Sequence, residues 1–176
     1  YKSSARKSLE MSNQQPDWDR VLQFFEPKEP LYCPELKTIS LPQKAFLRCE
    51  SLEAFYGGAA GGGKSSALLM AALQYVDIPE YAAILFRKTL TDLRLPGALM
   101  DRLKKWICQY PEVRWNGSEF IATFPSGARI TFGYLNNETD HERYKSAEFQ
   151  FVGMDEVSEI RQEHYEYLFS RLRRPD

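Results

Sequence analysis

The stretch "FYGGAAGGGKSSALLMAAL", residues 55–73, constrains this chain more than any other, because a backbone almost without side chains leads directly into an apolar run. The apolar run predicts a buried helix from Ser65 to about Val76, whereas the glycines before it favour an open loop. A flexible linker is the alternative, but linkers are seldom followed by so apolar a segment. The stretch therefore predicts a structured loop that ends where a helix begins.

The same stretch fits the spacing G-x-x-x-x-G-K-S from Gly58 to Ser65, which is the P-loop pattern. In such a loop the backbone N–H groups turn toward phosphate oxygens, and the N-terminus of the following helix adds a positive dipole end. The lysine then meets the β- and γ-phosphates, and the hydroxyl after it ligates magnesium. The nucleotide-binding residues that this pattern predicts are Gly58, Ala59, Ala60, Gly61, Gly62, Gly63, Lys64, Ser65 and Ser66.

A second motif carries two adjacent carboxylates. The run "FQFVGMDEVSEI", from residue 149, predicts a strand that ends in Asp155 and Glu156. α/β sheets present ligands at the carboxyl ends of their strands. On its own the pair also fits a solvated turn, but together with the loop it favours a catalytic site. We expect Asp155 to hold Mg²⁺ with Ser65. We expect Glu156 to orient and deprotonate the attacking water, and Lys64 to stabilise the phosphates.

Two observations bear on the nucleotide and the reaction. A glutamate directly after the magnesium aspartate is typical of ATPases that hydrolyse with their own base, and small-molecule kinases usually lack it. The guanine-reading motif N-K-x-D occurs nowhere in the chain. The sequence therefore predicts ATP and Mg²⁺ as the cofactors of a hydrolase.

The remaining patterns predict one α/β domain. Strands are expected in "LEAFYGG" (52–58), which runs into the loop, and in "AAILFRK" (82–88), an apolar run typical of a parallel sheet. Helices are expected from Pro42 through "QKAFLRC", over "PGALMDRLKKWICQY" (96–110) and over "QEHYEYLFSRLRR" (162–174). The predicted fold class is therefore a mostly parallel central sheet flanked by helices.

One segment departs from this α/β pattern. "EFIATFPSGARITFGYL" (119–135) alternates aromatic or β-branched residues around Pro125-Ser126-Gly127. This alternation predicts an antiparallel hairpin. We expect the hairpin to be an excursion at the edge of the sheet.

The N-terminal part of the chain has a different composition. Residues 1–40 are polar and interrupted by prolines, which predicts a mobile arm with a short helix in "DWDRVLQFF" (17–25). The predicted division is an arm over residues 1–40 and an ATPase core over residues 41–176.

Composition argues against a strongly basic nucleic-acid-binding protein, a disulfide-rich or zinc-binding protein and a membrane-spanning protein. The 23 basic and 24 acidic residues give a net charge of −1, so no overall basic field indicates nucleic acid, although a local patch is enough for a motor. Cys33, Cys49 and Cys108 are widely spaced and form no C-x-x-C, which favours reduced thiols over disulfides or zinc. No apolar run approaches the ~20 residues of a membrane span.

The order of these motifs resembles the large terminase subunit of tailed bacteriophages, the ATP-driven motor that packages DNA into a procapsid. The resemblance covers roughly residues 40–174 and rests on "LPQKAFL", "FYGGAAGGGKSS", "ILFRKT", "HERYKSAEFQFVGMDE" and "YLFSRLRR". It implies a P-loop ATPase core of the additional-strand, catalytic-glutamate type that translocates double-stranded DNA. It also implies a homo-oligomeric ring docked on a portal protein, a small terminase subunit as partner, and the cytoplasm of the bacterial host as location.

The resemblance also adds site residues. Gln43 matches a glutamine ahead of the P-loop that reads adenine, a role that suits the donor and acceptor of an amide; an exposed helix residue is the alternative. The family supplies an arginine before the carboxylate strand, and we expect Arg143 to act in trans on the ATP of a neighbouring subunit. A surface pair with Asp140 or Glu142 is its alternative. Many terminases carry a basic residue in the loop where this chain has Ala60, so no arginine is expected there.

The coupling motif and the nuclease domain of the family lie beyond the position that corresponds to Asp176. We therefore expect this chain to be a C-terminally incomplete piece of such a subunit that does not cleave DNA.

Other basic residues keep two interpretations. Arg87, at the end of the second strand, either senses the nucleotide or pairs with a carboxylate. The basic end of the last helix either contacts DNA phosphates or complements the helix dipole. The basic residues of the helix at 96–110 are expected on its solvent face, namely Arg102, Lys104 and Lys105.

Three other functions remain open at this point. The first is another P-loop DNA motor, such as a helicase. The second is a P-loop phosphotransferase with "SRLRR" as a basic lid, and the third is a nucleotide-gated binding switch with little turnover.

Overall fold

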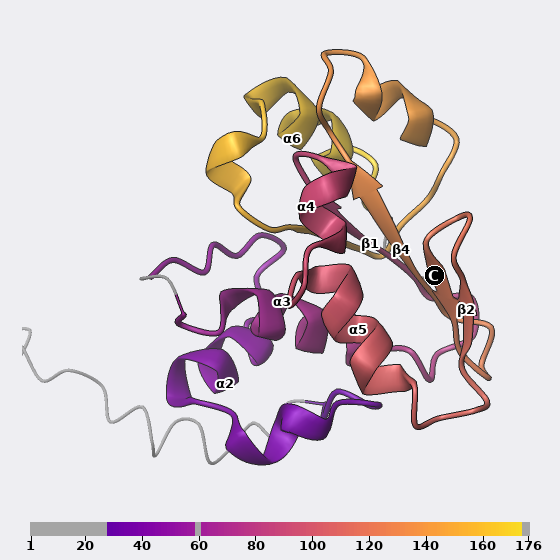
Figure 1. The fold of residues 1–176 in the computed structure, drawn as a ribbon. Helices are drawn as coiled ribbons and strands as arrows, with labels where there is room; N and C mark the ends of the chain where they lie inside the picture. Colours follow the sequence, from indigo (N-terminus) through magenta and orange to yellow (C-terminus); the bar gives the residue numbers. More distant parts are fainter. Residues whose placement is uncertain (1–27, 59–60, 174–176) are drawn as a thin grey trace, which may run out of the picture.

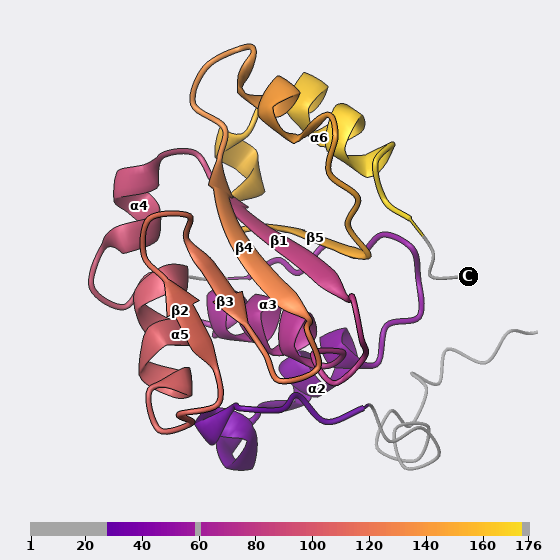
Figure 2. The ribbon, with the colours of Figure 1, turned by 90° about the vertical axis from the view of Figure 1, so that its right-hand side faces the viewer.

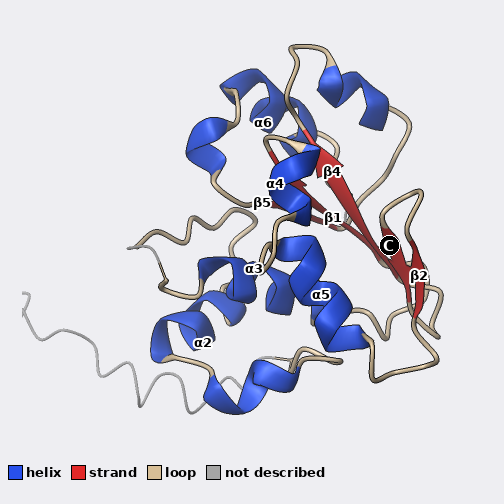
Figure 3. Ribbon diagram, in the orientation of Figure 1, coloured by secondary structure: helices blue, strands red, loops and turns tan. Residues whose placement is uncertain are grey.

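The computed structural model describes residues 28–58 and 61–173, in which a five-stranded sheet packs against helices (Figures 1 and 3). The strands are β1 (Ala82–Arg87), β2 (Arg114–Asn116), β3 (Ile121–Thr123), β4 (Arg129–Tyr134) and β5 (Phe151–Met154). The α-helices are α2 (Leu41–Leu47), α3 (Lys64–Leu73), α4 (Leu90–Arg94), α5 (Leu99–Ile107) and α6 (Gln162–Phe169). The 3₁₀ helices are η1 (Pro34–Thr38), η2 (Asp140–Tyr144) and η3 (Val157–Glu159).

The sheet has the strand order β2-β3-β4-β1-β5 (Figure 2). Strand β1 pairs in parallel with β4 on one side and with β5 on the other, so Ile84 lies opposite both Thr131 and Val152. Strands β2 and β3 extend the sheet beyond β4 by antiparallel pairing. The structure is therefore a mixed α/β fold with a parallel core and antiparallel strands at one edge.

Strand β1 is buried on both faces, and its alternating side chains divide the core in two. Ala83 and Leu85 join the cluster that contains the buried side chains of α3 and α5. Ile84 and Phe86 join a second cluster with Leu168 of α6. Because successive side chains of a strand point to opposite faces, α3 and α5 cover one face of the sheet and α6 covers the other.

Several elements predicted from the sequence are confirmed. The strand at 82–88 is β1, the helix after the glycine loop is α3, and the helix within 96–110 is α5. The helix that was expected to begin near Pro42 is α2, and the side chains of Ser40 and Gln43 close a capping box at its N-terminus. These are the segments with the clearest apolar periodicity or the clearest start signal.

The predicted hairpin at 119–135 is confirmed as β3 and β4, but its place in the sheet differs from the expectation. Strands β2 and β3 do lie toward the sheet edge, whereas β4 is the middle strand and pairs in parallel with β1 along its whole length. The second arm of the hairpin is therefore part of the parallel core. The physical reason is that the apolar β1 is buried on both faces and needs a strand on each side for its backbone groups.

The predicted strand at 52–58 is wrong. This segment leads into the glycine loop as expected, but it has no strand pairing in the structure. A cavity of about 920 Å³ separates it from the outer edge of β5, with Phe55 and Gly57 on one wall and Phe151 and Gly153 on the other. A strand needs a neighbour for its N–H and C=O groups, and the segment 52–58 pairs with none of the described strands.

The predicted helix at 162–174 is shorter than expected, because α6 ends at Phe169. The chain then turns back to the sheet, where Leu172 forms a parallel bridge with Phe149 and the N–H of Arg173 donates to the carbonyl of Phe149 at 2.9 Å. The helical pattern of the sequence continues past this point, but the backbone of Leu172 and Arg173 pairs with Phe149, two residues before β5, instead of continuing the helix.

The N-terminal segment is described from residue 28. Tyr32, Cys33 and Ile39 pack against the larger core cluster. The helix predicted at 17–25 lies outside the described residues, and the division of the chain at residue 40 stays a prediction. None of the helices over residues 28–58 and 61–173 combines the length and hydropathy needed to cross a membrane.

Candidate active site

The glycine loop enters α3 through backbone conformations that side chains disfavour. Gly58, Gly61 and Gly63 have φ angles of 139°, 81° and 73°. Gly63 is the N-cap residue of α3, and a Cβ atom there would lie 2.5 Å from Nε2 of Gln43. The positive φ of Gly63 therefore disfavours any other residue, and a Cβ atom there would also displace the Gln43 amide. Two of the predicted loop residues, Ala59 and Ala60, lie outside the described residues.

Lys64 is the first residue of α3, at the end of the helix that carries unpaired N–H groups. Its Nζ donates a hydrogen bond to the carbonyl of Gly58 at 3.1 Å. The hydroxyl of Tyr56 donates to the carbonyl of Gly62 at 3.4 Å, across the same loop. A cation and a helix N-terminus thus meet at one place, which is the combination that binds anions.

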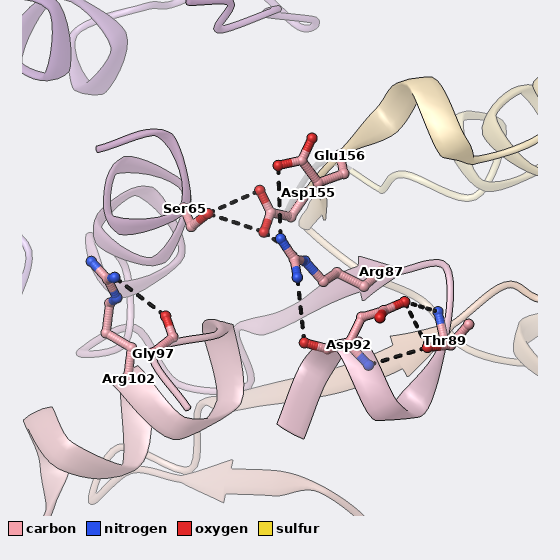
Figure 4. Close-up of polar contacts among 8 residues, drawn as sticks. All are labelled: Ser65, Arg87, Thr89, Asp92, Gly97, Arg102, Asp155 and Glu156. Atoms are coloured by element: carbon pink, nitrogen blue, oxygen red, sulfur yellow. Dashed lines mark hydrogen bonds and ion pairs between the residues drawn. The ribbon is translucent and has the colours of Figure 1, made fainter. Parts of the chain in front are cut away.

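Ser65 and Asp155 meet although 90 residues separate them in the chain. The Ser65 hydroxyl lies 3.1 Å from Oδ1 and 3.0 Å from Oδ2 of Asp155 (Figure 4). Asp155 directly follows β5 and is only 5% exposed. Hydroxyl and carboxylate oxygens are the ligands that Mg²⁺ prefers, so these two residues fit the predicted metal.

A metal at this position needs further ligands. No group of three or more His, Cys, Asp or Glu side chains in the described ranges is arranged to hold a metal ion. Mg²⁺ usually keeps several waters and takes one or two carboxylates together with substrate phosphates. The pair Ser65 and Asp155 therefore suits a magnesium ion that arrives with a nucleotide better than a permanently bound structural ion.

Arg87, the last residue of β1, lies against both carboxylates. Its Nε donates to Oδ2 of Asp155 at 2.9 Å, and its Nη2 lies 3.8 Å from Oε1 of Glu156. A third contact runs from Nη1 to the carbonyl of Asp92, at 3.4 Å (Figure 4). Of the two interpretations of Arg87, the structure shows the pairing with a carboxylate.

Glu156 follows Asp155 with its backbone in the left-handed region, at φ 54° and ψ 49°. This turn separates the two adjacent carboxylates. The Asp155 side chain is 4% exposed and points to Ser65, whereas the Glu156 side chain is 50% exposed. The two predicted roles, metal ligand and base for a water molecule, therefore fall to a buried and an accessible carboxylate respectively.

Gln43 lies beside the loop but its amide is engaged within the protein. Its Oε1 accepts hydrogen bonds from the N–H and the hydroxyl of Ser40, at 2.9 and 3.0 Å. Its Nε2 donates to the carbonyl of Gly63 at 3.1 Å, and the residue is 8% exposed. The alternative of an exposed helix residue is therefore wrong, and Gln43 ties the N-terminus of α2 to the loop. Its reading of adenine stays a prediction.

The cavity beside β5 reaches the site at one end. Lys64, Asp155 and Glu156 line that end, and the rest of the wall follows the outer edge of β5. Large exposed apolar side chains line it elsewhere, namely Leu52, Phe55, Tyr75 and Phe169. The polar end is thus the part of the cavity that belongs to the candidate site.

One contact to the loop helix was missed by the sequence reasoning. Arg102 of α5 was expected on the solvent face, but its Nη1 donates to the hydroxyl of the buried Ser66 and its Nη2 donates to the carbonyl of Gly97 at 3.2 Å (Figure 4). Nη1 also lies 3.8 Å from Oε2 of Glu35. Helical spacing identifies the buried face of α5, but no sequence signal says which polar residue reaches a neighbouring helix.

Arg143 lies in η2, after the carboxyl end of β4. Its Nη2 pairs with Oδ1 of Asp140 at 3.0 Å, and its guanidinium lies over the Tyr134 ring, 4.8 Å from the ring centre. The side chain is 49% exposed. The pair with Asp140 matches the alternative interpretation of this residue, and action in trans stays a prediction.

Helix α6 contacts η2 through two histidines. Nδ1 of His141 lies 2.9 Å from Nδ1 of His164, and His164 is fully buried. Burial is the largest influence that lowers the pKa of His164, followed by the charges of His141 and Arg161. These residues connect α6 to η2 beside the site and have no contact with Asp155 among the described hydrogen bonds.

The basic residues after α6 make local contacts. Arg171 donates to the hydroxyl of Tyr167 at 3.0 Å, and Nε of Arg173 lies 3.6 Å from a carboxylate oxygen of Glu148. Arg174, the last basic residue of the helix predicted at 162–174, lies outside the described residues.

The sequence was compared with protein families, curated proteins and solved structures. No curated protein and no solved structure matches the chain. The family described as "Terminase large subunit, T4likevirus-type, N-terminal" matches residues 55–174 of 176. This range contains the glycine loop, strand β1 with Arg87, strand β5 with the carboxylates that follow it, and helix α6. The family supports a role in viral DNA packaging. The chain therefore belongs to the family of large terminase subunits of the T4-like type, whose N-terminal region it matches.

Proposed function

We propose that this chain is the ATPase domain of a viral DNA-packaging motor, with a P-loop NTPase fold of the additional-strand, catalytic-glutamate type. It hydrolyses ATP with Mg²⁺ and uses the reaction to move double-stranded DNA into a procapsid. One observation carries the proposal: the Ser65 hydroxyl lies 3.0 to 3.1 Å from both carboxylate oxygens of Asp155, at the N-terminus of a helix that follows a glycine loop.

Each residue of the site has a distinct task in this proposal. The loop backbone and the N-terminus of α3 bind the phosphates, and Lys64 balances their charge. Ser65 and Asp155 would hold Mg²⁺, which neutralises charge on the phosphate oxygens when it is bound. Glu156 orients a water molecule through its accessible carboxylate and takes its proton. Gln43 contacts the base of the nucleotide.

The motor function needs partners outside this chain. We propose a homo-oligomeric ring of subunits that docks on a portal protein, receives DNA from a small terminase subunit and works in the cytoplasm of the bacterial host. The family match supports this assembly because packaging of viral DNA is what the family indicates.

Arg143 is the residue we assign to communication between subunits. A guanidinium brought to a neighbour's ATP stabilises the charge of the transferred phosphoryl group, an effect worth ~10³-fold or more. In the described structure Arg143 pairs with the buried carboxylate of Asp140, but its own side chain is 49% exposed, so the guanidinium is accessible from outside the domain. Arg143→Ala subunits, inactive alone, should regain ATPase activity when mixed with Glu156→Gln subunits. A mixture that stays inactive in confirmed rings would exclude the trans role.

The proposed function is tested by Asp155→Asn in the complete subunit. The variant should lose most Mg²⁺-dependent ATP hydrolysis and DNA translocation, because an amide binds Mg²⁺ poorly compared with a carboxylate. Glu159→Gln is the matched control, since it removes an exposed carboxylate four residues away and should keep parental activity. Equal hydrolysis by Asp155→Asn and the parent would refute the proposal.

A further inference from the structure

The contact between Arg87 and Asp155 is fixed by the register of the sheet. The last residue pair between β1 and β5 is Phe86 with Met154, and the N–H of Asp155 then donates to the carbonyl of Phe86 at 2.9 Å. Arg87 and Asp155 therefore leave two adjacent parallel strands at the same level. Their ion pair at 2.9 Å follows from the strand pairing and does not depend on flexible surface loops.

The guanidinium compensates a buried charge. The Asp155 side chain is 4% exposed, and its two described side-chain partners are Ser65 and Arg87. The serine hydroxyl is neutral, so Arg87 is the partner that supplies a positive charge. A buried carboxylate is costly unless it is paired, and this pair is hydrogen-bonded as well.

The arginine also lies where a metal ion would compete with it. Oδ2 of Asp155 accepts from both Ser65 at 3.0 Å and Arg87 at 2.9 Å. A magnesium ion held by Ser65 and Asp155 would need to come within about 2.1 Å of a carboxylate oxygen. At that distance the ion and the guanidinium repel each other, whichever of the two carboxylate oxygens the ion takes.

Two other contacts give the displaced guanidinium a place to move. Its Nη1 donates to the carbonyl of Asp92, which the capping box between Thr89 and Asp92 holds at the start of α4. Its Nη2 is already 3.8 Å from Oε1 of Glu156. A small rotation about the Asp92 contact would carry the guanidinium from Asp155 toward Glu156; Figure 4 shows the three contacts of Arg87.

We propose that Arg87 is a positioning residue that takes the place of the magnesium ion beside Asp155 in the nucleotide-free protein. It holds the Asp155 carboxylate there and moves toward Glu156 when the metal binds. The inference rests on the proposed magnesium site at Ser65 and Asp155. Because the metal must displace a cation, it binds weakly alone. The phosphates of a nucleotide add ligands and negative charge, so the metal and the nucleotide bind together.

The test is a titration of the nucleotide-free 176-residue chain with Mn²⁺, a paramagnetic substitute for Mg²⁺ whose free form is measured by electron paramagnetic resonance. Arg87→Gln should bind Mn²⁺ roughly tenfold more tightly than the parent, because a competing positive charge is gone. Arg87→Lys keeps the charge and should stay within about threefold of the parent. Asp155→Asn should abolish the tight site in the Arg87→Gln background, which identifies the ion's position.

Arg94→Gln is the matched control, since it removes an arginine of α4 that lies over the Phe120 ring instead of a carboxylate. It should leave Mn²⁺ affinity unchanged. An Arg87→Gln protein that is folded by circular dichroism and binds Mn²⁺ no more tightly than the parent would overturn the proposal. The titration contains no nucleotide, so its result does not depend on ATP binding. Loss of ATP binding, which would contradict the proposed function, is measured in a separate experiment.

If Arg87→Gln does not fold, the parent protein itself provides the test. The Arg87 Nε–H resonance, assigned as the signal missing from Arg87→Lys, should shift when Mg²⁺ is added with ADP and should not shift with ADP alone. A resonance that responds equally with and without Mg²⁺ would overturn the proposal.

Discussion

The two sides of the candidate site are built in different ways. On the carboxylate side, Arg87 and Asp155 leave adjacent strands at a level fixed by backbone pairing, and their side chains are 19% and 4% exposed. On the phosphate side, the loop is backbone with few side chains, and Gly57, Gly58 and Gly61 are exposed. The described contacts of the loop are made mostly by backbone carbonyls, as at Gly58, Gly62 and Gly63.

This difference teaches which half of the site depends on the fold and which depends on the ligand. The sheet positions the carboxylates before any ligand arrives. The loop offers N–H groups whose orientation a bound phosphate chain would complete. Changes on the phosphate side should therefore affect ATP binding first, and changes on the carboxylate side should affect the chemical step first.

The largest effect is expected from Lys64→Ala, which breaks the phosphate side. Removing the charge that meets the β- and γ-phosphates should lower kcat/KM for ATP by roughly 10³-fold, mostly through lost ATP affinity. Isothermal titration with ATP and a steady-state ATPase assay measure the two quantities. An unchanged ATP affinity would show that Lys64 does not contact the nucleotide, and the comparison between the two sides would fail.

Glu156→Gln breaks the carboxylate side. The amide keeps the size of the side chain but cannot accept a proton, so hydrolysis should slow by ~10²-fold or more while ATP affinity changes little. In the complete subunit, single-turnover kinetics measure the rate of hydrolysis and an equilibrium binding assay measures the affinity for ATP. Parental hydrolysis with intact binding would remove Glu156 from the mechanism.

Gln43 connects the loop to α2, and two variants separate its possible roles. Gln43→Ala and Ser40→Ala both break the capping box and should each lower the free energy of unfolding by about 1 kcal/mol. If Gln43 also reads adenine, only Gln43→Ala should weaken ATP relative to GTP, by a factor of several. Chemical denaturation and competition binding measure the two effects. The same nucleotide preference in both variants would limit Gln43 to its structural role.

The smallest effect concerns the flank of the site, where His164 lies buried against His141. Because burial lowers the folded-state pKa of His164, the unfolded chain takes up a proton at a higher pH than the folded chain does. Stability should be intact above the unfolded pKa of about 6.5 and should be lost as the pH falls through the folded pKa. Thermal unfolding between pH 7.5 and pH 5, values chosen to bracket about 6.5, tests this. His164→Phe should reduce the pH dependence of the unfolding temperature. An equal change of unfolding temperature with pH in the parent and the variant would contradict this role of His164.

The sequence predicts best those elements whose own residues determine them. α3 follows from a glycine loop and an apolar run, and β1 from an apolar run buried on both faces. The approach of Ser65 to Asp155 was also expected, because both lie at motif positions that meet at the carboxyl edge of a parallel sheet.

What the sequence does not predict depends on residues far apart in the chain. The segment 52–58 has strand-forming residues but no adjacent strand, so its propensity is not realised. The contacts of Arg87 with Asp155 and of Arg102 with Ser66 require the strand register and the helix packing, which local patterns do not contain. For both arginines, the sequence predicts the charge and the place in a strand or helix, but it does not predict which residue the guanidinium contacts.

The backbone at Glu156 places stability and activity in opposition. A residue with a Cβ atom at φ 54° is held in a conformation that costs roughly 1 kcal/mol, and glycine or asparagine would occupy it with less strain. The position thus favours a small residue for folding, whereas the proposed mechanism needs an acid there. In that mechanism, variants selected for thermal tolerance alone would accumulate glycine at this position and lose activity while remaining well folded, so stability should not be used as a substitute for function when this domain is engineered.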